Sequence, residues 1–280
     1  MNDTDPFAYV GRSRSSDDIV TQQSVDRFVA TLSEYVAAVD PRTAPLGYHW
    51  CIGNDILTQD ELTEDGSTPG LLGPTRRDLP HRVWAGGNIE FYSPIPIGAT
   101  VRRDERVLTV NTKAGRRGPI CLINLKVEYK TEERLCIEEW RTLALIDRQS
   151  HQGASAEEPK PAPGLVSASI RFDPDPVLLF RYSALTFNSH RIHFDRRYSS
   201  SVEKVDGLVV QGPLQATVLL NIGAKANSGG PRRFEYRNLR VLTDHPGSRI
   251  DMVQKVGSTV TTAIYDHQGM ATTIASADQG

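Results

Sequence analysis

Residues 181–220 read RYSALTFNSHRIHFDRRYSSSVEKVDGLVVQGPLQATVLL. Apolar runs stand at both ends of this stretch, and polar side chains are dense between them. Two histidines, an asparagine, an aspartate and four arginines fall within the 17 residues from Arg181 to Arg197. Buried polar groups need hydrogen-bond partners, and functional groups gather in loops that rigid elements hold in place. The stretch therefore predicts two helices joined by a loop that carries chemistry.

The flanks extend this stretch into an α+β unit. Asp175 and Pro176 have the residue types of a helix N-terminus and precede VLLFRYSALTF, while the apolar run 213–226 has helical length. Strand-like segments stand before and after the helices, at 166–172, 233–242, 249–253, 259–265 and 270–277. The second half thus predicts helices followed by an antiparallel meander.

The first half repeats this order. Apolar residues within 25–39 recur at helical spacing, and Asp40-Pro41 supplies a stop. Strand-like segments follow at 88–92, 100–110, 120–129 and 135–146, with a hairpin composition at 113–118. An extended run ends in SPIPIG at Gly98 in this half and in TDHPG at Gly247 in the other, 149 residues later. This repetition predicts two copies of a unit in which a sheet wraps a helix.

Composition divides the chain and limits its partners. Residues 151–164, HQGASAEEPKPAPG, have the composition of a linker, so we expect an N-terminal unit at 1–150 and a C-terminal unit at 165–280. The net charge of −2, from 32 basic and 34 acidic residues, is not that of a nucleic-acid binder. No stretch approaches the roughly 18 apolar residues of a membrane span, and the three cysteines form no Cys-x-x-Cys pair. We expect a cytoplasmic protein with neither nucleic-acid nor membrane partners.

Two kinds of chemistry fit the polar loop poorly. A metal could use His190, His193 and Asp195 as ligands, but the arginine between the histidines disfavours a cation, and we expect no metal. A serine nucleophile would need the strand, Gly-x-Ser-x-Gly turn and helix of a nucleophile elbow, which the loop lacks.

Water addition to an activated double bond fits the loop better. This reaction requires a base with a pKa near neutrality, a group that orients water, and an amide aimed at a thioester oxygen. A histidine of the loop supplies the base, and Asn188 supplies the orienting group. Gly212 stands at the start of a predicted helix, where the helix dipole favours negative charge.

The same residues resemble a known family. YSALTFNSHRIHFD, followed about a dozen residues later by GLVVQGPL, is similar to the active-site loop and central-helix start of MaoC-like hotdog hydratases. In the first half, LPHRVWAGGNIEFYSPIPIG resembles the two-hotdog branch that includes hydroxyacyl-thioester dehydratase type 2 and the itaconyl-CoA and mesaconyl-CoA hydratases. The resemblance implies an α+β double hotdog fold, in which two antiparallel sheets each wrap a helix.

The family pattern Asp-x-Asn-Pro-x-His implies roles for individual residues. His193 falls on the catalytic histidine and Asn188 on the aspartate, so the resemblance implies that His193 moves the protons of water and Asn188 holds the water. The Gly212 amide is expected to polarise the thioester carbonyl. Substrate contacts are expected from Tyr182, His190, Arg191, Arg196 and Gln211.

The resemblance implies a hydro-lyase that reversibly hydrates an enoyl-CoA, with a short branched dicarboxylic acyl group such as itaconyl or mesaconyl favoured, as in itaconate degradation. CoA is part of the substrate, and no separate cofactor is implied. The first half lacks the Asn/His signature, so we expect it to shape the acyl pocket without catalysis. A 3-hydroxyacyl-thioester dehydratase of fatty-acid metabolism, a hotdog thioesterase, a non-catalytic acyl-thioester-binding protein and a homodimer remain open. Arg102, Arg103 and Arg106 are expected to be solvated.

Overall fold

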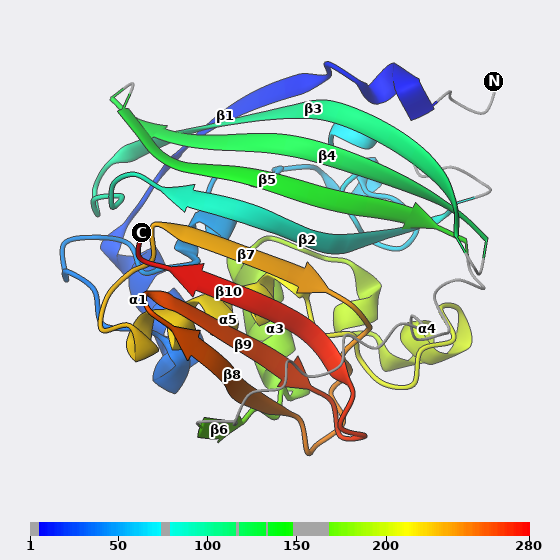
Figure 1. The fold of residues 1–280 in the computed structure, drawn as a ribbon. Coiled ribbons are helices and arrows are strands. Elements are labelled where there is room, and N and C mark those ends of the chain that lie inside the picture. The colour runs from blue at the N-terminus through cyan, green and yellow to red at the C-terminus, as the bar shows by residue number, and fades with distance from the viewer. Residues whose placement is uncertain (1–5, 74–78, 116–117, 133, 148–167) are drawn as a thin grey trace.

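The computed structural model describes residues 6–73, 79–115, 118–132, 134–147 and 168–280. The first half contributes β1 (Ser13–Ile19), β2 (His81–Phe91), β3 (Thr100–Gly115), β4 (Gly118–Thr131) and β5 (Arg134–Ile146). The second half contributes β6 (Ala168–Arg171), β7 (Arg233–Asn238), β8 (Arg249–Val256), β9 (Thr259–Tyr265) and β10 (Ala271–Asp278). These strands form one antiparallel sheet in the order β1-β3-β4-β5-β2-β7-β10-β9-β8-β6 (Figure 1).

The strand order has internal symmetry. If β1 to β5 are matched with β6 to β10, the order is the same when it is read from either edge of the sheet. The halves meet where β2 pairs antiparallel with β7, and Ile89 lies opposite Phe234 there. The repeated corners, Gly98 and Gly247, lie just before β3 and β8. The predicted repeat is confirmed for the strand order, and the sheets of the two halves are joined edge to edge.

The helices of the second half begin as predicted. Asp175 caps α3 (Pro176–Leu185) by accepting a hydrogen bond from Leu178 N. Helix α5 (Gly212–Ala226) lies behind β7 to β10 in Figure 1 and contacts β2, β7, β9 and β10. Every residue of α5 from Leu214 to Ala224 is buried, so the helix is covered on all sides. It is therefore the central helix of this half.

The first half is built differently around its sheet. Helix α1 (Gln22–Leu32) ends before the predicted limit of residue 39, because Ser33 has a φ of 45° and the chain continues as a 3-10 turn, η2 (Ser33–Tyr35). Helix α1 packs against α3 of the other half. Between η2 and β2 the described chain forms three short 3-10 turns, η3 (Tyr48–Cys51), η4 (Gln59–Glu61) and η5 (Gly70–Leu72). Within the described residues, the first half thus has no helix as long as α5 before β2.

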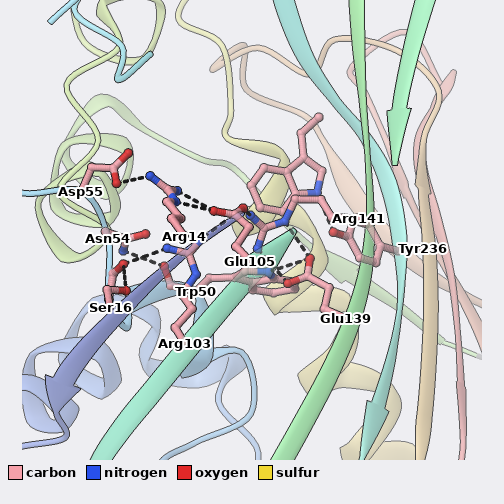
Figure 2. A network of polar contacts seen from close by, with 12 residues as sticks. Arg14, Ser16, Trp50, Asn54, Asp55, Arg103, Glu105, Glu139, Arg141 and Tyr236 are labelled. Carbon is pink, nitrogen blue, oxygen red and sulfur yellow. Dashed lines mark hydrogen bonds and ion pairs between the residues drawn. The ribbon is translucent and has the colours of Figure 1, made fainter. Parts of the chain in front are cut away.

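Charged side chains occupy part of the space beneath the first-half sheet. Arg141 donates to both carboxylate oxygens of Glu139, at 2.8 and 3.0 Å, and lies 3.3 Å from Glu105. Arg14 forms ion pairs with both Glu105 and Asp55, so positive and negative side chains alternate from Glu139 to Asp55 (Figure 2). A buried ion that keeps its partners avoids the cost of an unpaired charge.

Three arginines of β3 differ in their surroundings. Arg102 and Arg106 are exposed as expected, whereas Arg103 is only 5% exposed and lies beside a carboxylate of the same strand. The expectation that Arg103 is solvated was wrong. Alternate residues of a strand share one face, and Arg103 shares its face with buried Val101 and Val107.

The expected linker, 151–164, lies outside the described residues and stays a prediction. All three cysteines are free, and Cys121 and Cys136 are buried. Among the helices in the described ranges, none is long and apolar enough to cross a membrane.

Candidate active site

A cavity of about 560 Å³ has walls from both halves of the chain. The second half contributes the segment after α3, the start of α5 and the residues after β7. The first half contributes parts of β2 to β5 and the segment before β2. The cavity brings together six of the predicted site residues: Tyr182, Asn188, His190, His193, Gln211 and Gly212.

Asn188 is held at the turn that ends α3. Phe187 has a φ of 49°, which is unusual for a bulky residue, and the Asn188 N–H donates to Ser183 O at 2.8 Å. The Asn188 Oδ1 accepts a hydrogen bond from the His190 N–H at 3.0 Å. Because a backbone N–H can only donate, this contact assigns the side-chain oxygen and leaves Nδ2 as the free end. Asn188 therefore offers hydrogen-bond donors to the cavity.

His193 lies in a 3-10 turn, η6 (Arg191–His193), and is 6% exposed. Its Nδ1 lies 2.7 Å from Val209 O. A carbonyl oxygen can only accept, so the proton is on Nδ1 and the lone pair on Nε2. Burial, with a contribution from His190, lowers the pKa of His193 to about 3. The ring is therefore neutral near pH 7 with a lone pair on Nε2, and its pKa lies below the near-neutral value that the sequence analysis expected for the base.

A loop of the first half supports His190. The Asp65 carboxylate lies 3.4 Å from His190 Nε2, which favours a proton on that nitrogen. Burial lowers the pKa of His190, and Asp65 opposes this shift. The carboxylate of Asp65 is itself fixed by the Ser67 N–H and by the hydroxyls of Ser67 and Thr63. This is a carboxylate and histidine pair that the sequence analysis did not identify.

The same loop also holds the backbone of the catalytic segment. The Arg191 N–H donates to Asp65 O at 2.8 Å, and the Ser189 hydroxyl donates to Gly66 O at 2.6 Å. A Cβ on Gly66 would lie 2.3 Å from Ser189 O, so only glycine allows this approach. More than 120 residues separate the two loops in the sequence, and no local pattern could have connected them.

Gly212 is the first residue of α5, where backbone N–H groups lack acceptors within the helix. A Cβ on Gly212 would lie 2.7 Å from Asn238 Nδ2 and 3.2 Å from Trp84 Cβ. The Gln211 side chain donates to Leu179 O and Ser183 Oγ, both at 2.9 Å, while its Oε1 is buried without a protein partner. The helix start therefore presents an amide donor beside a free acceptor.

Tyr182 lines the cavity but is fully buried in the main hydrophobic core. Its hydroxyl lies 3.2 Å from Thr217 Oγ1, with which it shares a hydrogen bond. The geometry supports a packing role more directly than the expected substrate contact.

The structure does not bring Arg191 and Arg196, from which substrate contacts were expected, into the cavity. Arg191 binds Asp195 at 2.8 Å, and its guanidinium stacks on Tyr198 with 4.2 Å to the ring centroid. Arg196 binds Asp244. Neither arginine is part of the cavity wall. The expectation that they contact substrate was based on nearness in the sequence, which does not fix the direction of a side chain.

Arginines of the first half line the cavity instead: Arg14, Arg82, Arg103 and Arg141. Arg82 and Trp84 belong to the segment LPHRVWAGG, to which the sequence analysis gave no site role. For Arg103 the local signal available was its place on the same strand face as Val101 and Val107, since a period of two indicates the covered face.

Known proteins are similar to this chain in sequence and in architecture. A sequence model of the hydroxyacyl-thioester dehydratase type 2 family matches residues 47–244. Mesaconyl-C(4)-CoA hydratase of Chloroflexus aurantiacus is 33% identical over 266 residues, which cover 90% of this chain and 93% of the relative.

Two solved structures show the same fold. A MaoC-like dehydratase from Phytophthora capsici superposes with a TM-score of 0.71 at 13% identity, covering 98% of this chain and 97% of the other. A conserved hypothetical protein of Mycobacterium tuberculosis, described as a double hotdog, superposes with a TM-score of 0.54 at 14% identity, covering 97% and 96%. The chain therefore belongs to the hydroxyacyl-thioester dehydratase type 2 family and has the double hotdog fold.

Proposed function

We propose that the protein is a hydro-lyase that reversibly adds water to the double bond of an enoyl-CoA thioester. The observation that carries the proposal is the tautomer of His193, whose Nδ1 proton is held by Val209 O and whose Nε2 is free to accept a proton. Asn188 and the start of α5 at Gly212 line the same cavity. The name of the 33% identical relative, a hydratase of an enoyl-CoA, supports the assignment.

In the proposed reaction, Asn188 Nδ2 donates to the oxygen of a water molecule and His193 Nε2 removes one of its protons. The water oxygen bonds to the β-carbon while the π electrons of the double bond move toward the thioester. The Gly212 amide stabilises the negative charge that develops on the carbonyl oxygen. His193 then transfers its proton to the α-carbon. One water is consumed, the thioester stays intact, and the histidine returns to its neutral form.

We propose that the first half shapes the acyl pocket and takes no part in proton transfer. Its arginines and the side chains of Leu71, Leu72 and Leu143 are part of the cavity wall. The favoured substrate is a short branched dicarboxylic enoyl-CoA, of the itaconyl or mesaconyl type found in itaconate degradation. The leucines also support a second candidate, the 3-hydroxyacyl-thioester dehydratase of fatty-acid metabolism, whose acyl chain is apolar.

A panel of enoyl-CoAs, followed by loss of the absorbance of the conjugated thioester, tests the assignment. His193→Ala should lower kcat by about 10²–10⁴-fold, the contribution of a general base. Asn188→Ala should lower kcat because the side chain that holds the water is lost, and Asn188→Asp, whose free carboxylate oxygen holds water only by accepting a hydrogen bond, should retain part of it. Near-normal turnover by His193→Ala would overturn the proposal, and so would release of free CoA thiol without hydration, which indicates a thioesterase.

Three further points are proposals of the same kind. Water addition transfers no electrons, so we propose that no cofactor is needed beyond the CoA of the substrate; activity that dialysis against a chelator abolishes and a metal restores would contradict this. A cytoplasmic location is supported by the three free cysteines, and cell fractionation tests it. A homodimer is supported by the exposed side chains of Val177 and Phe180 on α3, and sedimentation of the purified protein tests it.

A further inference from the structure

Three of the four first-half arginines in the cavity wall have their charge matched by carboxylates. Arg141 binds Glu139 and Glu105, Arg103 lies 3.4 Å from Glu105, and Arg14 binds Glu105 together with Asp55 (Figure 2). Three guanidinium groups and three carboxylates cancel in this cluster. The cluster therefore stabilises the wall of the cavity without offering a free charge to a ligand.

Arg82 on β2 is different. Its guanidinium donates to two backbone carbonyls, Pro69 O at 3.0 Å and Thr68 O, and no carboxylate of the described residues forms an ion pair with it. Asp65, Asp55 and Glu105 affect its pKa only through space, and burial dominates by lowering the pKa. Two of the five N–H donors of an arginine are thus used. A cation in this position is costly unless an anion joins it.

Arg82 is also placed near the reacting end of the cavity. It stands two residues before Trp84, whose Cβ is next to Gly212, and alternate residues of a strand lie about 7 Å apart on one face. The charge of Arg82 is close enough to lower the pKa of His190, in addition to the larger effect of burial. A four-carbon acyl group with its thioester oxygen at Gly212 would extend roughly one such step along β2.

We propose that Arg82 binds the distal carboxylate of a dicarboxylic enoyl thioester and selects it over uncharged acyl groups. This inference rests on the proposed hydratase function and adds a subsite to it. The N–H donors that remain after the two carbonyl contacts can bind both oxygens of a carboxylate. The backbone carbonyls of Thr68 and Pro69 hold the guanidinium in place before the ligand arrives, so little side-chain entropy is lost on binding.

The test compares mesaconyl-C(4)-CoA with 3-methylcrotonyl-CoA, in which a methyl group replaces the distal carboxylate. The measured quantity is the ratio of kcat/KM for the two thioesters. Arg82→Gln should lower this ratio by about 100-fold or more, because one partner of a partly buried charge pair is removed. Arg82→Lys keeps the charge and loses the planar fork, so its ratio should lie between those of wild type and Arg82→Gln. This variant provides the test if the glutamine variant does not fold. Arg233→Gln is the matched control, since Arg233 lies on the adjacent strand β7, is 61% exposed and is bound to Glu90.

An unchanged ratio in Arg82→Gln and Arg82→Lys overturns the inference. An equal loss of activity with both thioesters also leaves the ratio unchanged and overturns the inference; repeating the assay with pantetheine thioesters, which lack phosphate, then shows whether Arg82 binds the phosphates of CoA or holds the segment at residues 68–69. Wild-type protein that hydrates 3-methylcrotonyl-CoA but rejects the dicarboxylic thioester also overturns the inference and leaves the hydratase function intact. Wild-type protein that hydrates no enoyl-CoA removes the proposed function itself.

Discussion

Replacing Gly212 by alanine should separate catalysis from folding. The new Cβ would lie 2.7 Å from Asn238 Nδ2 and 3.2 Å from Trp84 Cβ, whereas atoms in contact prefer about 3.5–4.0 Å. Asn238 cannot move aside freely, because its Nδ2 donates to Trp84 O at 2.7 Å and its Oδ1 accepts from Thr273 Oγ1 at 2.9 Å. The start of α5 must therefore shift by roughly 0.5–1 Å.

A shift of this size would remove the Gly212 amide from the thioester oxygen. Displacing a group by about 1 Å, or losing one oxyanion donor, costs about 10²-fold or more in rate. We expect kcat of Gly212→Ala to fall about 100-fold, with a stability loss of about 1–3 kcal/mol from overpacking. Steady-state hydration of the enoyl-CoA that wild-type protein prefers measures the first quantity, and urea unfolding measures the second.

Gly223→Ala is the matched control on the same helix. Its Cβ would lie 2.7 Å from Ala277 Cβ on β10, as close as the contact at the helix start, but at the opposite end of α5. This variant should lose a similar amount of stability and keep its kcat. Near wild-type kcat in Gly212→Ala would refute the reasoning, and so would an equal loss of kcat in both variants.

Three more variants test the site and its support. The pKa of His193 in the folded protein, about 3, is below the usual value of 6.5. Between pH 6.5 and pH 3 the unfolded chain therefore binds one more proton than the folded protein, and the free energy of unfolding falls as pH drops. Measured by urea unfolding, His193→Gln should lose less stability than wild type between pH 7.5 and pH 5. Asp65→Asn removes the carboxylate that raises the pKa of His190, so the pKa of His190 followed by NMR titration should fall, whereas Asp60→Asn at an exposed neighbouring position should leave it unchanged. Glu139→Gln leaves a buried guanidinium without its bidentate partner and should cost about 3–5 kcal/mol in thermal or urea unfolding; a loss below about 1 kcal/mol would show that the pair is not a net support.

Local signals were enough for much of the second half. Asp175 and Pro176 marked the start of α3, and the start of α5 was predicted to within one residue. Both are short-range effects, because a cap bonds to the first turn of its own helix. The candidate catalytic groups could also be predicted from one local stretch of sequence, since Asn188, His193 and Gly212 lie within 25 residues of one another.

Long-range contacts decided what the sequence analysis missed. Asp65 reaches His190 only because the chain folds the first-half loop over the catalytic segment. Arg191 and Arg196 are next to the site in sequence, yet their side chains point to carboxylates outside the cavity. Helix α1 ended early at Ser33, whose left-handed backbone no periodicity could reveal.

The sequence by itself determined the repeated unit, its central helix and the loop with Asn188 and His193, because periodicity, caps and turn residues act over a few residues. Only the tertiary structure decided that the two sheets join through β2 and β7, that Arg14, Arg82, Arg103 and Arg141 line the cavity, and that His193 carries its proton on Nδ1. The physical reason is that pairing of charges, tautomers and strand edges depends on partners that are distant in the chain and are brought near only by folding.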